Sequence, residues 1–176
     1  KVSYDDFSVW AVSRKPSKTA ENAKSESPAK KYLVANQDDF LISMTKAQPG
    51  DEVIIKNGTY RNWSVEVEAH GSKEKAIVIR PETKGQVTFT ADDVLKKSMF
   101  TFKGSYLDFD GFVFKGIALD NSLVIFDATR HTRFLNNELS NIEGVENIGR
   151  VVSLMGQGAD NVFANNLFRD SENVLL

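Results

Sequence analysis

The chain has 176 residues, of which 41% are hydrophobic and 26% are charged, and its formal net charge is −2. This composition is typical of one globular domain, and the near-neutral charge argues against nucleic acid or an anionic membrane surface as the partner. The absence of cysteine excludes a disulfide scaffold and a thiolate metal site, and no apolar run is long enough to predict a membrane span.

The first part of the chain is predicted to be a tail and a polar linker. An apolar alternation at 7–11 is compatible with one short strand. Residues 13–31 contain no aromatic residue and no Val, Ile or Leu, so we expect a solvated linker. The predicted organisation is therefore a tail and linker over 1–31 and one domain over 32–176. Because the chain begins with Lys1 rather than Met, we expect that a preceding segment has been removed.

One helix is predicted, over 38–48. Asn36 or Asp38 can cap its N-terminus, and Pro49 and Gly50 end it. Its apolar residues recur at helical spacing, namely Phe40, Leu41, Met44 and Ala47.

The rest of the sequence is a series of short apolar runs separated by turn residues, a pattern that fits a β-sandwich or a solenoid. An internal repeat favours the solenoid. FDGFVFKG, LNNELSNIEG and ANNLFRDSEN align Gly111 with Asn137 and Asn166, and roughly 20 to 30 residues form one rung of a β-helix. We therefore predict an all-β, right-handed parallel β-helix whose N-terminal end is capped by the helix, because an uncovered end would pair with another chain.

Alternation with polar residues predicts which side chains face the interior of this β-helix. The residues expected inside are Phe109, Phe112, Phe114, Val124, Phe126, Leu135, Leu139, Val152, Leu154, Phe163 and Leu167.

Several stretches resemble a known family. YLVANQDDFLISMTKAQPGDEVIIKNGTYRN at 32–62 is similar to the opening of the alginate lyase and chondroitinase B family, polysaccharide lyase family six. The resemblance continues through SYLDFDGFVFKG at 105–116 and RVVSLMGQGADNVFANNLF at 150–168, and it covers about residues 32–176. The Pro-Gly-Asp and Asn-Gly-Thr-Tyr pieces occur in other β-helix families as well, so they specify the fold more strongly than the family.

The resemblance implies β-elimination on a uronate polymer, with alginate as the first expectation. In the family a calcium ion neutralises the uronate carboxylate, a lysine removes the C5 proton and an arginine assists the leaving oxygen. An Asn and two Glu residues hold that calcium. These groups lie on later rungs, so no catalytic residue and no metal ligand is assigned in this chain. The resemblance also implies a bacterial protein that is secreted or periplasmic.

Four basic residues are the candidates for binding an acidic polysaccharide. Arg130, His131 and Arg133 form a basic cluster between two predicted strands, and Arg150 precedes another strand. Guanidinium groups suit carboxylates because they present a planar fork of donors. The alternative for the cluster is an exposed turn with ordinary charges.

Three functions remain open from the sequence. The chain can be the N-terminal part of a lyase, a non-catalytic module that binds acidic polysaccharide, or a structural spacer. The lyase is favoured because the resemblance extends over several rungs.

Overall fold

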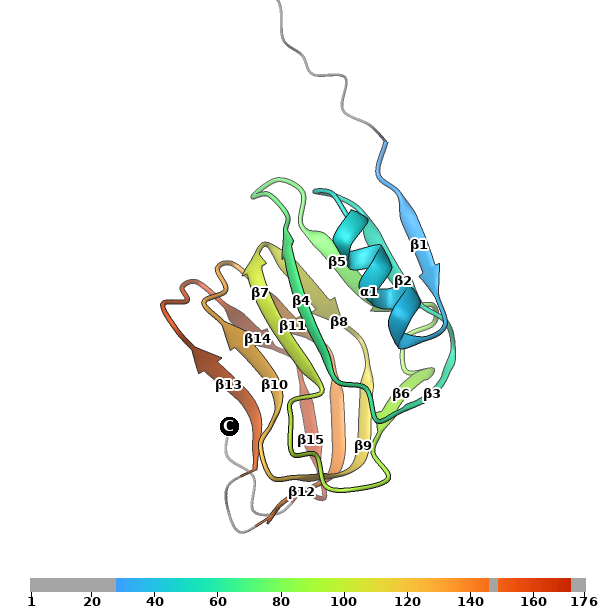
Figure 1. Ribbon diagram of the computed structural model, residues 1–176, viewed down its shortest axis with the longest axis vertical. Helices are drawn as coiled ribbons and strands as arrows, with labels where there is room; N and C mark the ends of the chain where they lie inside the picture. The colour runs from blue at the N-terminus through green and yellow to red at the C-terminus, as the bar shows by residue number, and fades with distance from the viewer. Residues whose placement is uncertain (1–27, 146–148, 172–176) are drawn as a thin grey trace, which may run out of the picture.

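The structure is a computed structural model that describes residues 28–145 and 149–171. The strand expected at 7–11 and most of the expected linker lie outside these residues. The chain winds into a parallel β-solenoid in which each turn contributes one strand to each of three sheets (Figure 1). Every described strand pairing is parallel, as the predicted β-helix requires.

Three sheets, named A, B and C below, form the sides of the solenoid. Sheet A contains, in spatial order, β1 (Lys31–Val34), β2 (Glu52–Ile55), β5 (Ile77–Pro81), β8 (Leu107–Asp110), β11 (Arg133–Leu135) and β14 (Val162–Ala164). Sheet B contains β3 (Gly58–Arg61), β6 (Val87–Thr90), β9 (Val113–Leu119), β12 (Glu138–Gly144) and β15 (Leu167–Arg169). Sheet C contains β4 (Val65–His70), β7 (Phe100–Ser105), β10 (Ser122–Asp127) and β13 (Arg150–Met155).

Alternation along the strands fills the interior with aromatic side chains. In β7, Phe100 and Phe102 are fully buried while Lys103 faces outward. Equivalent positions of successive turns stack, so the rings of Phe109 and Phe134 lie parallel with centroids 5.6 Å apart. Such stacks make the core continuous from one turn to the next, and the hydrophobic effect thereby fixes the register of the turns.

The predicted helix is confirmed as α1 (Gln37–Lys46), which covers the N-terminal end of the solenoid (Figure 1). Asn36 is the N-cap, because its side chain accepts a hydrogen bond from the backbone N–H of Asp39 at 2.8 Å. Phe40 is fully buried and packs on Trp63, with ring centroids 5.5 Å apart. Trp63 is therefore part of the cap packing. Among the described residues no helix is long and apolar enough to cross a bilayer.

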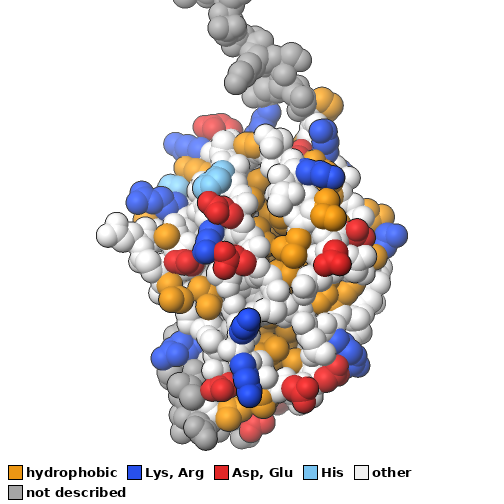
Figure 2. Space-filling view, viewed as in Figure 1, with side chains coloured by type: hydrophobic (Ala, Val, Ile, Leu, Met, Phe, Trp, Pro, Cys, Tyr) orange, Lys and Arg blue, Asp and Glu red, His pale blue; other side chains and the backbone are white. Residues whose placement is uncertain are grey.

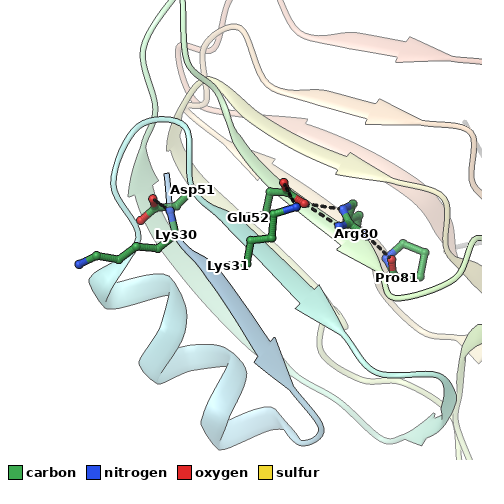
Figure 3. Close-up of polar contacts among 6 residues, drawn as sticks. All are labelled: Lys30, Lys31, Asp51, Glu52, Arg80 and Pro81. Carbon is green, nitrogen blue, oxygen red and sulfur yellow. Dashed lines mark hydrogen bonds and ion pairs between the residues drawn. The ribbon is translucent and has the colours of Figure 1, made fainter. Parts of the chain in front are cut away.

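Polar contacts tie the first strand to the solenoid (Figure 3). The backbone N–H of Lys30 donates to Asp51 at 2.7 Å. On the neighbouring strands, Glu52 lies between Lys31 at 3.1 Å and Arg80 at 2.6 Å. The resulting chain of charges joins β1, β2 and β5, so the first turn is held by electrostatics as well as by backbone pairing.

At the turns between sheets A and B, the predicted alignment of the repeats is wrong by one residue. Asp110 pairs with Leu135, so Gly111 is level with Asn136 rather than with Asn137. Gly111 and Asn136 both have positive φ, at 88° and 52°, a conformation that Gly and Asn tolerate best. Asn137 and Asn166 are level with one another, as predicted.

The predicted interior is confirmed at Phe109, Phe112, Phe114, Val124, Phe126 and Leu139, which are all at most 1% exposed. Leu135 and Leu167 were assigned to the wrong face, since they pair with the outward-facing Asp110 and Glu138. The interior position beside Leu135 is Phe134.

The last described turn shows a different departure from the prediction. Leu154 and Phe163 pair with the buried Phe126 and Phe134, so they face inward as predicted. They are nevertheless 64% and 39% exposed, because no described strand packs over them. Val152 is half-buried for the same reason.

Candidate polysaccharide-binding face

The four predicted binding residues fall at two separate places on the solenoid. Arg130, His131 and Arg133 lie at the corner where sheet C passes into sheet A, while Arg150 opens β13 at the other end of sheet C's strands. His131 has a φ of +52°, and this left-handed residue turns the chain within the cluster. Arg130 lines one hollow, whereas His131 and Arg133 line another together with Lys73 and the carboxylates of Asp108 and Asp160.

Arg130 lines a shallow cavity of about 420 Å³ on the outer side of sheet C, together with Glu68, His70, Lys103 and Asp127. The ammonium group of Lys103 lies 2.6 Å from Glu66 Oε1, and this hydrogen bond raises the pKa of Lys103. Figure 2 shows this face, where Lys and Arg side chains stand beside Asp and Glu side chains. The cavity at Arg130 therefore has mixed charge.

Arg133 forms a two-pronged ion pair with Asp108 on the neighbouring strand of sheet A. Its Nε donates to Asp108 Oδ1 at 2.5 Å, and its Nη2 donates to Oδ2. The Asp108 side chain is only 8% exposed, and its hydrogen bonds raise the pKa of Arg133 further above the ordinary value. Because this fork already holds a protein carboxylate, we do not place Arg133 in the binding face.

His131 stacks on Tyr106 of the preceding turn, with ring centroids 4.5 Å apart and an angle of 17° between the rings. Its Nδ1 lies 3.7 Å from Asp160 of the following turn. All three residues have φ between +52° and +55°, so they occupy equivalent places in successive turns. His131 therefore contributes to the packing of each of these turns on the next.

Arg150 lies beside a second hollow on the outer side of sheet C. Its backbone N–H donates to the carbonyl of Asn121 at 3.1 Å. Asn121 also lines a hollow of about 300 Å³ that includes Lys97 and Ser98. Sequence reasoning did not select Lys97 or Asn121. Lys97 lies three residues before β7, and the register between turns, which the sequence does not show, brings it to a hollow that shares Asn121 and Ile125 with the cavity at Arg150.

A further cavity, of about 840 Å³, extends from this region over the last described turn. Its inner part is lined by Leu154, Phe163 and Phe168, which belong to the interior of the solenoid. Chemistry on a sugar needs convergent polar groups, and this inner part has few. We therefore assign to the binding face only the polar, outer part of this cavity.

A calcium site is implied by the family resemblance, and the described residues do not fit one. Within 28–145 and 149–171 no group of three or more His, Cys, Asp and Glu residues could hold a metal ion. Calcium takes six to eight oxygen ligands, several of them carboxylates. No step of the chemistry is therefore assigned to a metal held by these residues.

Comparisons with known proteins show which family and which solved structures this chain resembles. The family model described as chondroitinase B matches residues 34–174. A solved mutant of the PL6 family alginate lyase AlyGC is 27% identical, with a TM-score of 0.68, and the match covers 78% of this chain and 19% of that one. A mannuronic acid specific polysaccharide family 6 lyase from human gut microbiota is 19% identical, with a TM-score of 0.53 over 70% of this chain and 33% of that one, and it supports the fold alone. No curated protein matches the chain.

The family match and the structural match are both consistent with the parallel solenoid described above. The chain spans about a fifth of the length of the alginate lyase structure that it resembles. It belongs to the chondroitinase B family, polysaccharide lyase family six, and forms an N-terminal β-helix portion of that family's fold.

Proposed function

We propose that this chain is the N-terminal part of a polysaccharide lyase that cleaves a uronate polymer, with alginate as the first candidate. The observation that carries the proposal is the family match over residues 34–174, together with 27% identity to an alginate lyase. The chain supplies the first turns of the solenoid and part of a binding face.

The reaction is a β-elimination. A base removes the proton from C5 of the uronate, the electron pair forms the C4=C5 double bond, and the bond from C4 to the glycosidic oxygen breaks while that oxygen gains a proton. The carboxylate at C5 makes this possible when its charge is neutralised, which is the role of calcium in the family. We assign neither the base nor the calcium ligands to this chain, so its residues hold and orient the polymer.

Binding without cleavage is the second candidate function. The outer face of sheet C carries hydroxyl groups and cations within the described residues, and it needs no other part of the protein to present them. A module of this kind would retain an acidic polysaccharide and release it at high salt.

The test uses the full-length protein that contains this chain, with alginate and with chondroitin and dermatan sulfates as substrates. Ultraviolet absorbance of the new double bond reports elimination. We expect turnover on alginate, supported by added calcium and abolished by a chelator. Tight binding to alginate with no absorbance change under any of these conditions would reject the lyase and leave the binding module.

A further inference from the structure

The sequence contains one asparagine that is followed directly by glycine, Asn57-Gly58, in the connection between β2 and β3. An asparagine before glycine is especially prone to spontaneous deamidation, because glycine has no side chain that would hinder attack by its backbone nitrogen. Both residues are exposed, so water can reach them. The pair is therefore a candidate site of covalent modification.

Deamidation of such a pair uses water as its only co-reactant. The backbone nitrogen of Gly58 attacks the side-chain carbonyl carbon of Asn57, and the new C–N bond closes a succinimide ring. The bond from that carbon to Nδ2 breaks, and ammonia leaves with the proton of the Gly58 nitrogen. Water then opens the ring at either carbonyl and leaves an aspartate or an isoaspartate. The first step needs a free Gly58 nitrogen and an Asn57 side chain that can rotate toward it.

In the folded chain both reacting groups are held by the following turn of the solenoid. The backbone N–H of Thr83 donates to Asn57 Oδ1 at 3.0 Å, and Asn57 Nδ2 donates to Thr83 Oγ1 at 3.1 Å. The backbone N–H of Gly58 donates to the carbonyl of Gln86 at 2.9 Å. The Asn57 backbone N–H donates to Glu82 Oε2 at 3.2 Å. These partners all lie between β5 and β6, so the contacts last only while this turn packs on the first.

Asn62, at the end of β3, provides a comparison within the same chain. Its side chain is held in the same way, because its Oδ1 accepts from the backbone N–H of Asp92 at 2.9 Å and its Nδ2 donates to Asp92 Oδ2 at 2.9 Å. The next residue is Trp63, whose large side chain hinders attack by the backbone nitrogen. The two asparagines therefore have equivalent contacts but differ in chemical reactivity.

We propose that Asn57 is a deamidation site that is protected in the packed solenoid and reacts when the turn carrying Thr83 separates from the first turn. The product cannot restore the original contacts. An aspartate lacks the Nδ2 donor for Thr83 and places a second carboxylate beside Glu82. An isoaspartate also adds one carbon to the main chain just before β3, which shifts this strand against β6. Modification of Asn57 therefore records an opening of the first turns and opposes their closure.

The test incubates the full-length protein in mildly alkaline buffer, with and without concentrated guanidinium chloride, and measures deamidation at Asn57 and Asn62 by peptide mass spectrometry. Three hydrogen bonds hold the reacting groups, so Asn57 should deamidate roughly a hundredfold more slowly in the folded protein than in denaturant. Thr83→Val removes the Oγ1 acceptor and should raise the rate in the folded protein about fivefold. Thr83→Ser keeps that acceptor and should retain the parental rate. Thr88→Val, on β6, is the matched control.

The outcomes decide the proposal without reference to lyase activity. Equal rates at Asn57 in the folded and the denatured protein overturn it, as does a rate at Asn57 in denaturant no higher than that at Asn62. A Thr83→Val rate equal to that of the parent, or matched by Thr88→Val, also overturns it. A faster rate in Thr83→Val alone, with thermal unfolding unchanged, supports it. If Thr83→Val fails to fold, the comparison of the folded and denatured parent protein decides alone.

Discussion

The side chain of Asn166 accepts a hydrogen bond from the backbone N–H of Asn137, at 2.9 Å, across one turn of the solenoid. Asn137 repeats the arrangement toward the preceding turn, because its Oδ1 accepts from the backbone N–H of Phe112, also at 2.9 Å. The Asn137 side chain is almost fully buried. The amides therefore form a ladder inside the turns, and each amide satisfies a backbone donor of a neighbouring turn.

Replacing Asn137 by Ala is expected to lower the free energy of unfolding by about 1–3 kcal/mol, since the buried N–H of Phe112 loses its acceptor. Urea unfolding followed by circular dichroism measures the change. Gln86→Ala is the control, because Gln86 is exposed and its change should stay within about 0.5 kcal/mol. Equal effects of the two substitutions would show that the amide ladder does not stabilise the fold.

The register of the strands predicts that two apolar side chains of sheet B contribute very differently to the free energy of unfolding. Phe114 is fully buried and its replacement by Ala should cost about 3–5 kcal/mol. Leu167 is 47% exposed and faces outward, so Leu167→Ala should cost less than about 1 kcal/mol. Chemical unfolding of both variants is the measurement. A cost at Leu167 as large as that at Phe114 would mean that the assignment of faces is wrong.

The ion pairs of Glu52 with Lys31 and Arg80 predict that the stability of the fold depends on pH. Burial of this carboxyl raises its pKa, but the hydrogen bonds and charges of Lys31 and Arg80 outweigh burial and hold the pKa below the ordinary value of 4.5. A carboxyl with a lowered pKa in the folded state stabilises the fold above its unfolded pKa, and this contribution disappears as the pH falls through the folded value.

The corresponding variant is Glu52→Gln. At pH 7 it should be less stable than the parent protein by about 0.5–1 kcal/mol, the range for a partly exposed ion pair. The difference should shrink below about pH 4.5 and vanish once the carboxyl is protonated, as thermal unfolding across pH would record. The exposed Glu74→Gln is the control. A stability difference that is constant from pH 7 to acid would contradict the role of the ion pairs.

The sequence was sufficient to predict the parallel solenoid, the cap helix and most of the interior, because alternation and capping are local patterns. It misplaced Gly111 by one residue because the turns differ in length, and a short repeat tolerates either alignment. It also misassigned Leu135, since the neighbouring Phe134 satisfies the same apolar pattern in the opposite phase.

The candidate binding residues show where local patterns are insufficient. Arg130, His131 and Arg133 are neighbours in sequence, yet Arg133 is engaged by Asp108 and His131 stacks on Tyr106. Lys97 and Arg150 are distant in sequence but line two hollows that share Asn121 and Ile125. Only the register between turns reveals this proximity, because it depends on the number of residues in each turn.

The most direct test of the central claim compares residues 1–176 alone with the full-length protein on alginate, measured by the ultraviolet absorbance of unsaturated uronate products. If this chain provides scaffold and binding face but neither base nor calcium ligands, only the full-length protein should generate the signal, with calcium present for both. Robust elimination by residues 1–176 would contradict the account and would direct the search for the catalytic groups to Lys103, Arg130, His131 and Arg150.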